Sequence, residues 1–232
     1  MSDILSVDGL SLRVANRVLL EGGSFSLARG ETVWLLDAEG SGKTALLKAI
    51  AGLLVPLSGE IRVLDLPPSP VVLSEIAYLP DCAHLPEALT PSELVRLFAK
   101  MFADFDAERA TALLHDLRVN TQKKLSALSR GTRDKIRLIL TMSRRVSLYL
   151  LDEPLGKADA TVRDYVLHLI TANKKEGASV LIATQNTSLI EEMLDSFLLL
   201  SEGKLTLSNK GSGGEEANGT TLDAHCKGDT VC

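Results

Sequence analysis

One short stretch of this chain has the residue types and spacing that bind phosphate. Its candidate nucleotide-binding residues follow one another without a gap: Asp37, Ala38, Glu39, Gly40, Ser41, Gly42, Lys43, Thr44 and Ala45. The glycines let the backbone turn tightly and aim successive N–H groups at one anion, to which Lys43 adds a full positive charge. The Thr44 hydroxyl is an oxygen ligand that suits Mg²⁺. The stretch therefore predicts a phosphate site, with an ordinary glycine turn as the alternative.

Two adjacent carboxylates end an apolar run later in the chain. Asp152 and Glu153 follow residues 148–151 and precede Pro154. A carboxylate at the end of a buried strand can hold Mg²⁺ through water, and a glutamate beside it can polarise an attacking water. We therefore assign Asp152 to the metal and Glu153 to catalysis. A plain acidic turn at the strand end is the alternative.

A third motif precedes a helical pattern upstream of the carboxylates. It consists of Ser129, Arg130 and Gly131, and it follows Leu128. A serine hydroxyl and the N–H groups at a helix start suit a phosphate. In isolation, however, the segment is an ordinary helix cap.

The elements that must position these motifs indicate an α/β protein. Short apolar or alternating segments predict an antiparallel layer of short strands, at 4–7, 10–14, 17–20 and 25–27. Continuous apolar runs predict buried strands, at 32–36, 76–79, 148–151, 179–183 and 197–200, with a further strand at 205–207. Helical patterns alternate with them, at 43–52, 160–174 and 188–194. Such alternation is typical of a mostly parallel sheet.

The region at about 86–145 is helical in pattern. Thr90, Pro91 and Glu93 have the spacing of a capping box with proline at the first helical position. One apolar face follows, made of Leu94, Leu97, Phe98 and Met101. Residues 67–70 are expected to be a stiff proline-rich loop.

Composition excludes several classes of protein. The chain has 232 residues, 45% hydrophobic and 24% charged, which are values of a globular protein. It has no apolar run near the roughly 20 residues that span a bilayer, so we expect no direct membrane insertion and a cytoplasmic location. A net charge of −5 argues against a nucleic-acid partner. From residue 209 the composition turns polar and small, which predicts a flexible tail at 209–232.

Taken together, these motifs resemble the ATP-binding-cassette (ABC) transporter ATPase subunits. The matching segments are GSGKT at 40–44, SGEI at 58–61, AYLP at 77–80, LSRGT at 128–132, LLDEP at 150–154, Asp159, and LLLSEGKL at 198–205. The pairing of LSRGT with LYLLDEP resembles the bacterial exporter-like branch. The resemblance implies a P-loop NTPase fold over 1–208, with an antiparallel β layer, a RecA-like, mostly parallel core sheet and a helical subdomain at about 86–145.

The resemblance also implies the cofactors and partners. ATP and Mg²⁺ would lie between two cassettes, each ATP held by the phosphate loop of one and by the Ser129–Gly131 segment of the other. Transmembrane permease subunits would dock on the helical subdomain and on the loop around Asp81. The chain would then lie peripherally on the cytoplasmic face of the plasma membrane, and ATP hydrolysis would drive transport.

Four positions depart from the family pattern. Arg13 and Val14 stand where an aromatic residue stacks on adenine; Val14 cannot stack, whereas Arg13 could lie over the ring. Asp37 replaces the first glycine of the phosphate loop. Asp81 replaces a glutamine; as a carboxylate it can ligate Mg²⁺ but cannot donate a hydrogen bond to water. Gln185 replaces the switch histidine, and none of the four histidines (84, 115, 168 and 225) fills that position.

All four departures belong to the half-site that this chain would use for its own nucleotide. Ser129, Arg130, Gly131 and Asp159, which it would lend to a partner, match the family. The hypothesis is a heterodimer in which the chain's own site turns over slowly, weakened at Asp37, Asp81 and Gln185. A slow homodimer is the alternative. A regulatory cassette that binds ATP without hydrolysis and gates a partner is the rival from another class.

Overall fold

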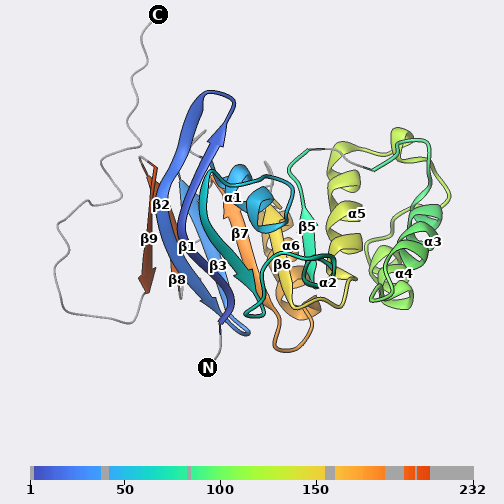
Figure 1. The fold of residues 1–232 in the computed structure, drawn as a ribbon. Coiled ribbons are helices and arrows are strands. Elements are labelled where there is room, and N and C mark those ends of the chain that lie inside the picture. Colours follow the sequence, from blue (N-terminus) through green and yellow to red (C-terminus); the bar gives the residue numbers. More distant parts are fainter. Residues whose placement is uncertain are drawn as a thin grey trace, which may run out of the picture.

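The computed structural model describes residues 3–37, 42–82, 85–154, 160–185, 196–201 and 203–209 of the 232-residue chain. Their strands form two sheets, and three helices lie together at one end of the molecule, far from the smaller sheet (Figure 1). The helix predicted at 188–194 and almost all of the predicted tail lie outside these residues. We found no helix in the described segments that is both long and apolar enough to span a bilayer.

The smaller sheet is antiparallel, in the order β2-β1-β4. Its strands are β1 (Asp3–Val14), β2 (Arg17–Ala28) and β4 (Ser58–Val63). The predicted antiparallel layer is confirmed, but the prediction of short strands broken at 8–9 and 21–23 is wrong. The glycines there form bulges: pairing shifts between Val7 and Leu10, and Gly9 and Gly22 have φ of 57° and 62°. Their N–H groups stay satisfied because they donate to the Ser24 and Ser11 hydroxyls.

The larger sheet has the order β5-β6-β7-β3-β8-β9. Its strands are β3 (Thr32–Asp37), β5 (Ile76–Leu79), β6 (Leu148–Asp152), β7 (Ser179–Thr184), β8 (Ser196–Ser201) and β9 (Lys204–Asn209). All neighbouring pairs are parallel except β8 and β9, which are antiparallel. Every residue of β6 and β7 is buried, as expected for strands covered on both faces.

Two apolar cores lie on opposite faces of this sheet, and side chains of each strand alternate between them. In β6, Leu148 and Leu150 pack into the core shared with the smaller sheet and α1 (Lys43–Ile50). Tyr149 and Leu151 pack into the other core, with the helical end of the molecule. This alternation decides which face the residue after Leu151 occupies.

The helical end contains α3 (Pro91–Met101), α4 (Ala107–Asp116) and α5 (Arg130–Met142), and α6 (Ala160–Asn173) packs against α5. The capping box at Thr90 and Glu93 is confirmed. Leu94 is buried, but Met101 is 62% exposed, so its assignment to the apolar face is wrong. The proline-rich loop prediction is wrong in part, because Ser69 caps a short helix, α2 (Pro70–Ser74), that begins with proline.

Candidate functional site

The chain enters the predicted phosphate site from β3 and leaves it through α1. Asp37 is the last residue of β3, while Ala38, Glu39, Gly40 and Ser41 lie outside the described residues. Gly42 precedes α1 with φ of 124°, a backbone conformation that other residues rarely adopt. Lys43, Thr44 and Ala45 then form the first turn, whose N–H groups lack intrahelical acceptors. This helix start is built to receive an anion.

The side chain of Lys43 adds a cation that is almost fully removed from water. Lys43 is 6% exposed, and Ala45 is buried beside it in the first turn. Lys43 lies close enough to Glu153 to lower the pKa of that carboxyl through its charge. Burying an ammonium group costs free energy unless anions lie close to it. Phosphate oxygens bound at this helix start would be such anions.

Asp152 faces α1 because it follows Leu148 and Leu150 on the same face of β6. Asp152 is 2% exposed, and it lies close enough to the Thr44 hydroxyl and the Asp81 backbone for both to lower the pKa of its carboxyl. The Tyr78 hydroxyl lies 3.4 Å from its Oδ2 atom. Burial raises the pKa of Asp152, whereas the bond from Thr44 opposes that shift. The structure thus brings together Thr44 and Asp152, the two residues predicted to face the metal.

Glu153 leaves the strand in a left-handed conformation, with φ of 48°. Its N–H donates to the Ala183 carbonyl at 2.9 Å, and its Oε2 atom accepts from the Thr184 hydroxyl at 3.2 Å. Its Oε1 atom is buried and has no hydrogen-bond partner among the residues that the structure describes. Burial raises the pKa of this carboxyl, and the charges of Asp152 and Asp81 add to the shift. A buried carboxylate oxygen without a partner fits a group that acts on a bound molecule.

Asp81 and Gln185 follow the two strands that flank β6. Asp81 comes after β5 and Gln185 after β7, and both are exposed. Because β5, β6 and β7 are parallel neighbours, the residues after them meet at one sheet edge. The Asp81 charge raises the pKa of both Asp152 and Glu153. All candidate catalytic residues therefore gather at the edge where β3 runs toward α1.

Two residues of this edge escaped prediction from the sequence. Thr184 is fully buried and holds the Glu153 carboxylate, and Tyr78 approaches Asp152 from the neighbouring strand. Each of these two residues lies near the end of a strand next to β6. That position could have identified them, but only with knowledge of the strand order.

The remaining predicted residues lie on other parts of the molecule. Val14 ends β1 and is 46% exposed. Its side chain is aliphatic, so it offers no aromatic surface to an adenine ring. Ser129 caps α5 by accepting the Thr132 N–H at 3.2 Å. Arg130 and Gly131 open that helix, and all three residues of this motif are exposed. Asp159 lies outside the described residues. Exposure leaves the start of α5 accessible to another molecule.

The residues present fit a magnesium nucleotide. A buried cation and the first-turn N–H groups of α1 match phosphate, while the Thr44 hydroxyl and the Asp152 carboxylate match the oxygen ligands that Mg²⁺ prefers. The Glu153 carboxyl lies close enough to Lys43 and to Asp152 for the charge of each to act on its pKa.

Comparisons with known proteins agree with this geometry. A family model described as ABC transporter matches residues 20–156, which is more than half of the chain. The chain is 29% identical over 208 residues to the SkfA peptide export ATP-binding protein SkfE of Bacillus subtilis, with 87% of each protein covered. It is 30% identical over 200 residues to the ABC transporter ATP-binding protein YtrB of the same organism, covering 85% of this chain and 68% of YtrB.

Solved structures show the same fold. A structure described as the ATP binding subunit of an ABC transporter has a TM-score of 0.80 at 28% identity, covering 89% of this chain and 90% of that one. A putative ABC transporter ATP-binding protein from Pyrococcus furiosus has a TM-score of 0.74 at 27% identity, covering 84% and 96% respectively. The predicted P-loop NTPase fold is confirmed. We conclude that this chain belongs to the ABC transporter family, within which it is an ATP-binding subunit of the ATPase type.

Proposed function

We propose that this subunit hydrolyses ATP slowly at its own half-site and lends Ser129, Arg130 and Gly131 to a different cassette. The observation that carries the catalytic part is the buried Oε1 atom of Glu153, which no described residue contacts by a hydrogen bond and which lies on a carboxyl close to the Lys43 charge. The observation that supports slow turnover is the Asp81 carboxylate, which lies close to Asp152 and Glu153 but cannot donate a hydrogen bond to the attacking water.

In this proposal each described residue has a separate task. Lys43 and the first-turn N–H groups of α1 bind the phosphates, and Thr44 and Asp152 hold Mg²⁺. When bound, the metal supplies neutralisation of phosphate charge and fixes the orientation of the phosphates. Asp81 is a third candidate ligand at the same edge.

Glu153 accepts the proton of the attacking water through Oε1. Its raised pKa makes it a better base than an ordinary surface glutamate, since the best catalytic pKa lies near the working pH. The Thr184 hydroxyl holds the other oxygen and so orients the carboxylate. The Gln185 amide donates to the terminal phosphate, but it stays neutral where a histidine could become a cation.

The partners follow from the same assignment. The exposed start of α5 suits a second cassette, and the helical end with the loop around Asp81 suits transmembrane permease subunits. Such an assembly holds the chain on the cytoplasmic face of the plasma membrane. Relatives named for peptide export and for hemin import match at 29% and 28% identity, so the cassette suits transport in either direction.

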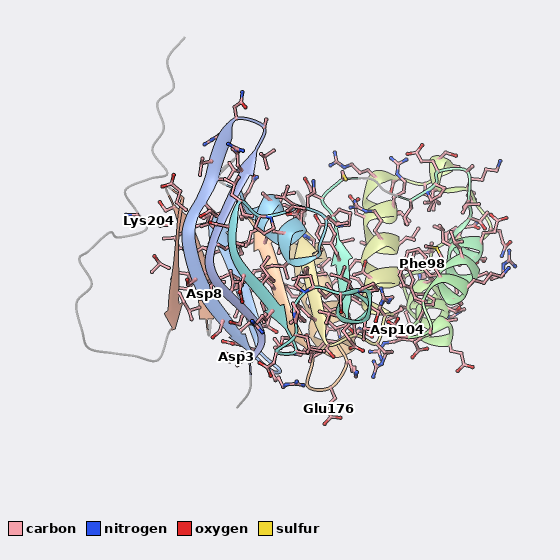
Figure 2. The ribbon with its side chains drawn as sticks, in the orientation of Figure 1. Asp3, Asp8, Phe98, Asp104, Glu176 and Lys204 are labelled. Atoms are coloured by element: carbon pink, nitrogen blue, oxygen red, sulfur yellow. The ribbon has the colours of Figure 1, made fainter. Side chains whose placement is uncertain are left out.

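The test combines equilibrium binding of labelled ATP with steady-state phosphate release, in the presence of Mg²⁺. Glu153→Gln should preserve binding and lower turnover by roughly 10²–10⁴-fold, the usual contribution of a general base. Glu176→Gln is the matched control, because Glu176 is exposed in the turn between α6 and β7, far from the sheet edge that carries Glu153 (Figure 2). Binding with no turnover in either protein would instead support a regulatory cassette that gates a partner without hydrolysis.

A further inference from the structure

An arginine of α5 reaches out of the helical end and holds the loop that follows β5. The Arg137 guanidinium donates to the carbonyl oxygens of Pro80 and Cys82, the latter at 2.8 Å, and pairs with Asp134 at 3.0 Å. Its side chain is only 11% exposed, and α5 lies next to β5 (Figure 1). Both carbonyls flank Asp81, so Arg137 fixes the backbone on each side of that residue.

The peptide group between Pro80 and Asp81 is held at both ends by charged side chains. Its carbonyl oxygen accepts from the Arg137 guanidinium. Its N–H, which belongs to Asp81, lies close enough to the Asp152 carboxylate to lower the pKa of that group, because Leu79 and Leu151 are paired just before these residues. A cation at the oxygen end polarises the peptide and strengthens the bond that its N–H makes. The path from α5 to Asp152 therefore contains one side chain and one peptide group.

We propose that Arg137 is a positioning residue that sets the Mg²⁺ affinity of this subunit by holding Asp152 through the Pro80–Asp81 peptide. The inference rests on the proposed function, in which Asp152 faces the metal. Arg137 touches neither nucleotide nor metal in this arrangement and acts only through the carboxylate. Because α5 begins directly after Ser129, displacement of this helix by a second cassette would reach Asp152 along the same path.

The test measures how much Mg²⁺ is needed for half-maximal binding of a fluorescent ATP analogue to the full chain. Arg137→Met should raise this concentration roughly tenfold, the lower end of what loss of an outer-sphere partner costs a metal site. Binding of the analogue in excess chelator should stay unchanged, because Lys43 and the start of α1 are untouched. Arg133→Met is the matched control: Arg133 lies one turn earlier on α5 and pairs with Glu87 at 3.1 Å instead.

Two further variants separate positioning from a structural role. Arg137→Lys keeps one donor and should give an intermediate Mg²⁺ requirement, and it serves in place of the methionine variant if that variant does not fold. In an Asp152→Asn background, Arg137→Met should add nothing to the loss. A lower melting temperature with an unchanged Mg²⁺ requirement would overturn the inference alone. A wild-type chain that binds no analogue would overturn the proposed function and this inference with it.

Discussion

Glu153 shows how a single residue can serve a site at the expense of the fold. It has a left-handed backbone, a buried oxygen without a partner and a carboxyl whose pKa burial has raised. Each of these features costs folding free energy in the nucleotide-free protein. Residues kept in such conformations are typical of active sites, where the stabilising partner arrives with the substrate.

Glu153→Gln should therefore stabilise the nucleotide-free protein at neutral pH. The folded pKa of Glu153 is raised, so the folded state binds a proton more readily than the unfolded chain, and stability falls as pH rises through this interval. The glutamine amide does not ionise, so the variant avoids this loss of stability at higher pH, and the Thr184 hydroxyl can still donate to the amide oxygen. Melting curves between about pH 4 and about pH 8 should show the largest gain at the higher pH and none near the ordinary glutamate pKa.

The expected gain is a few degrees, since about 1 kcal/mol shifts the melting temperature of a chain this size by roughly 2–4 °C. Glu176→Gln, which alters an exposed carboxylate, should change the curve little at any pH. A variant at Glu153 that melts at a lower temperature than the wild type at neutral pH would contradict this account.

Asp81→Gln should raise turnover. A glutamine adds an N–H donor for the attacking water and removes a carboxylate that would repel the phosphates. It also removes the charge that adds to the raised pKa of Asp152 and Glu153, but burial, the larger cause, still keeps the pKa of Glu153 raised. We expect kcat to rise about fivefold, which corresponds to roughly 1 kcal/mol of transition-state stabilisation. The fall of turnover at acid pH should also move to lower pH, because both carboxyls then lose their protons more easily.

Asp81→Asn is the companion variant for this measurement. It removes the same charge and adds the same amide, but on a shorter side chain, so equal gains in both variants would show that the effect does not depend on how far the amide donor reaches. Lower turnover in both would show that Asp81 serves the site as a metal ligand and that its charge is needed.

Among the elements, those with local signals are predictable from sequence. The core strands are continuous apolar runs, and the start of α3 carries its own cap at Thr90 and Glu93. The phosphate-binding turn and the carboxylate pair are contiguous motifs. Such features need no knowledge of the rest of the chain, because neighbouring residues form them.

Features that depend on distant partners are not predictable in the same way. Gly9 and Gly22 are residues typical of turns, but each lies in a bulge within a strand, where its N–H donates to a serine hydroxyl of the opposite strand, Ser24 and Ser11 respectively. Thr184 and Arg137 reach the site from a neighbouring strand and from α5, so their roles appear only once strand order and helix packing are known. Met101 is apolar by type, but the end of α3 leaves it in solvent.

Gly59, in the SGEI motif, lies where β4 packs closely against the Gly9 bulge of β1. It lies in β4 with φ of 90°, and an added Cβ atom would meet the backbone of Gly9 at 2.5 Å. Because the obstacle is backbone, Gly59→Ala should push β4 away from β1 and lower the melting temperature strongly. Gly177→Ala is the control: its φ is 73°, but nothing lies within 4 Å of an added Cβ.

The control isolates backbone strain from crowding. Gly177→Ala should cost only the strain of a left-handed alanine, about 1–2 kcal/mol. Thermal unfolding of both variants measures the difference. Equal shifts would mean that the contact between β4 and the Gly9 bulge adds nothing to stability.

At the scale of the whole molecule, two functional surfaces lie on different parts of the chain. The strand edge with Lys43, Asp152 and Glu153 is largely buried, while the start of α5 is open to solvent. In the proposed heterodimer the first surface serves this chain's own slow site, and the second completes the site of the partner cassette. Damage to the two surfaces should then have unequal consequences for the assembly.

This inequality is measurable in the native transporter complex, purified through a tag on the other subunits. Ser129→Arg places a bulky cation at the exposed cap of α5, where it would enter the partner's nucleotide site, and should remove most of the ATPase activity of the complex. Glu153→Gln should remove only the minor share contributed by this chain. Ser26→Arg, an exposed substitution on β2 of the smaller sheet, controls for an added charge away from both proposed contact surfaces. If Glu153→Gln stops the complex as completely as Ser129→Arg does, the two sites are equivalent or coupled, and the division of labour proposed for this chain is wrong.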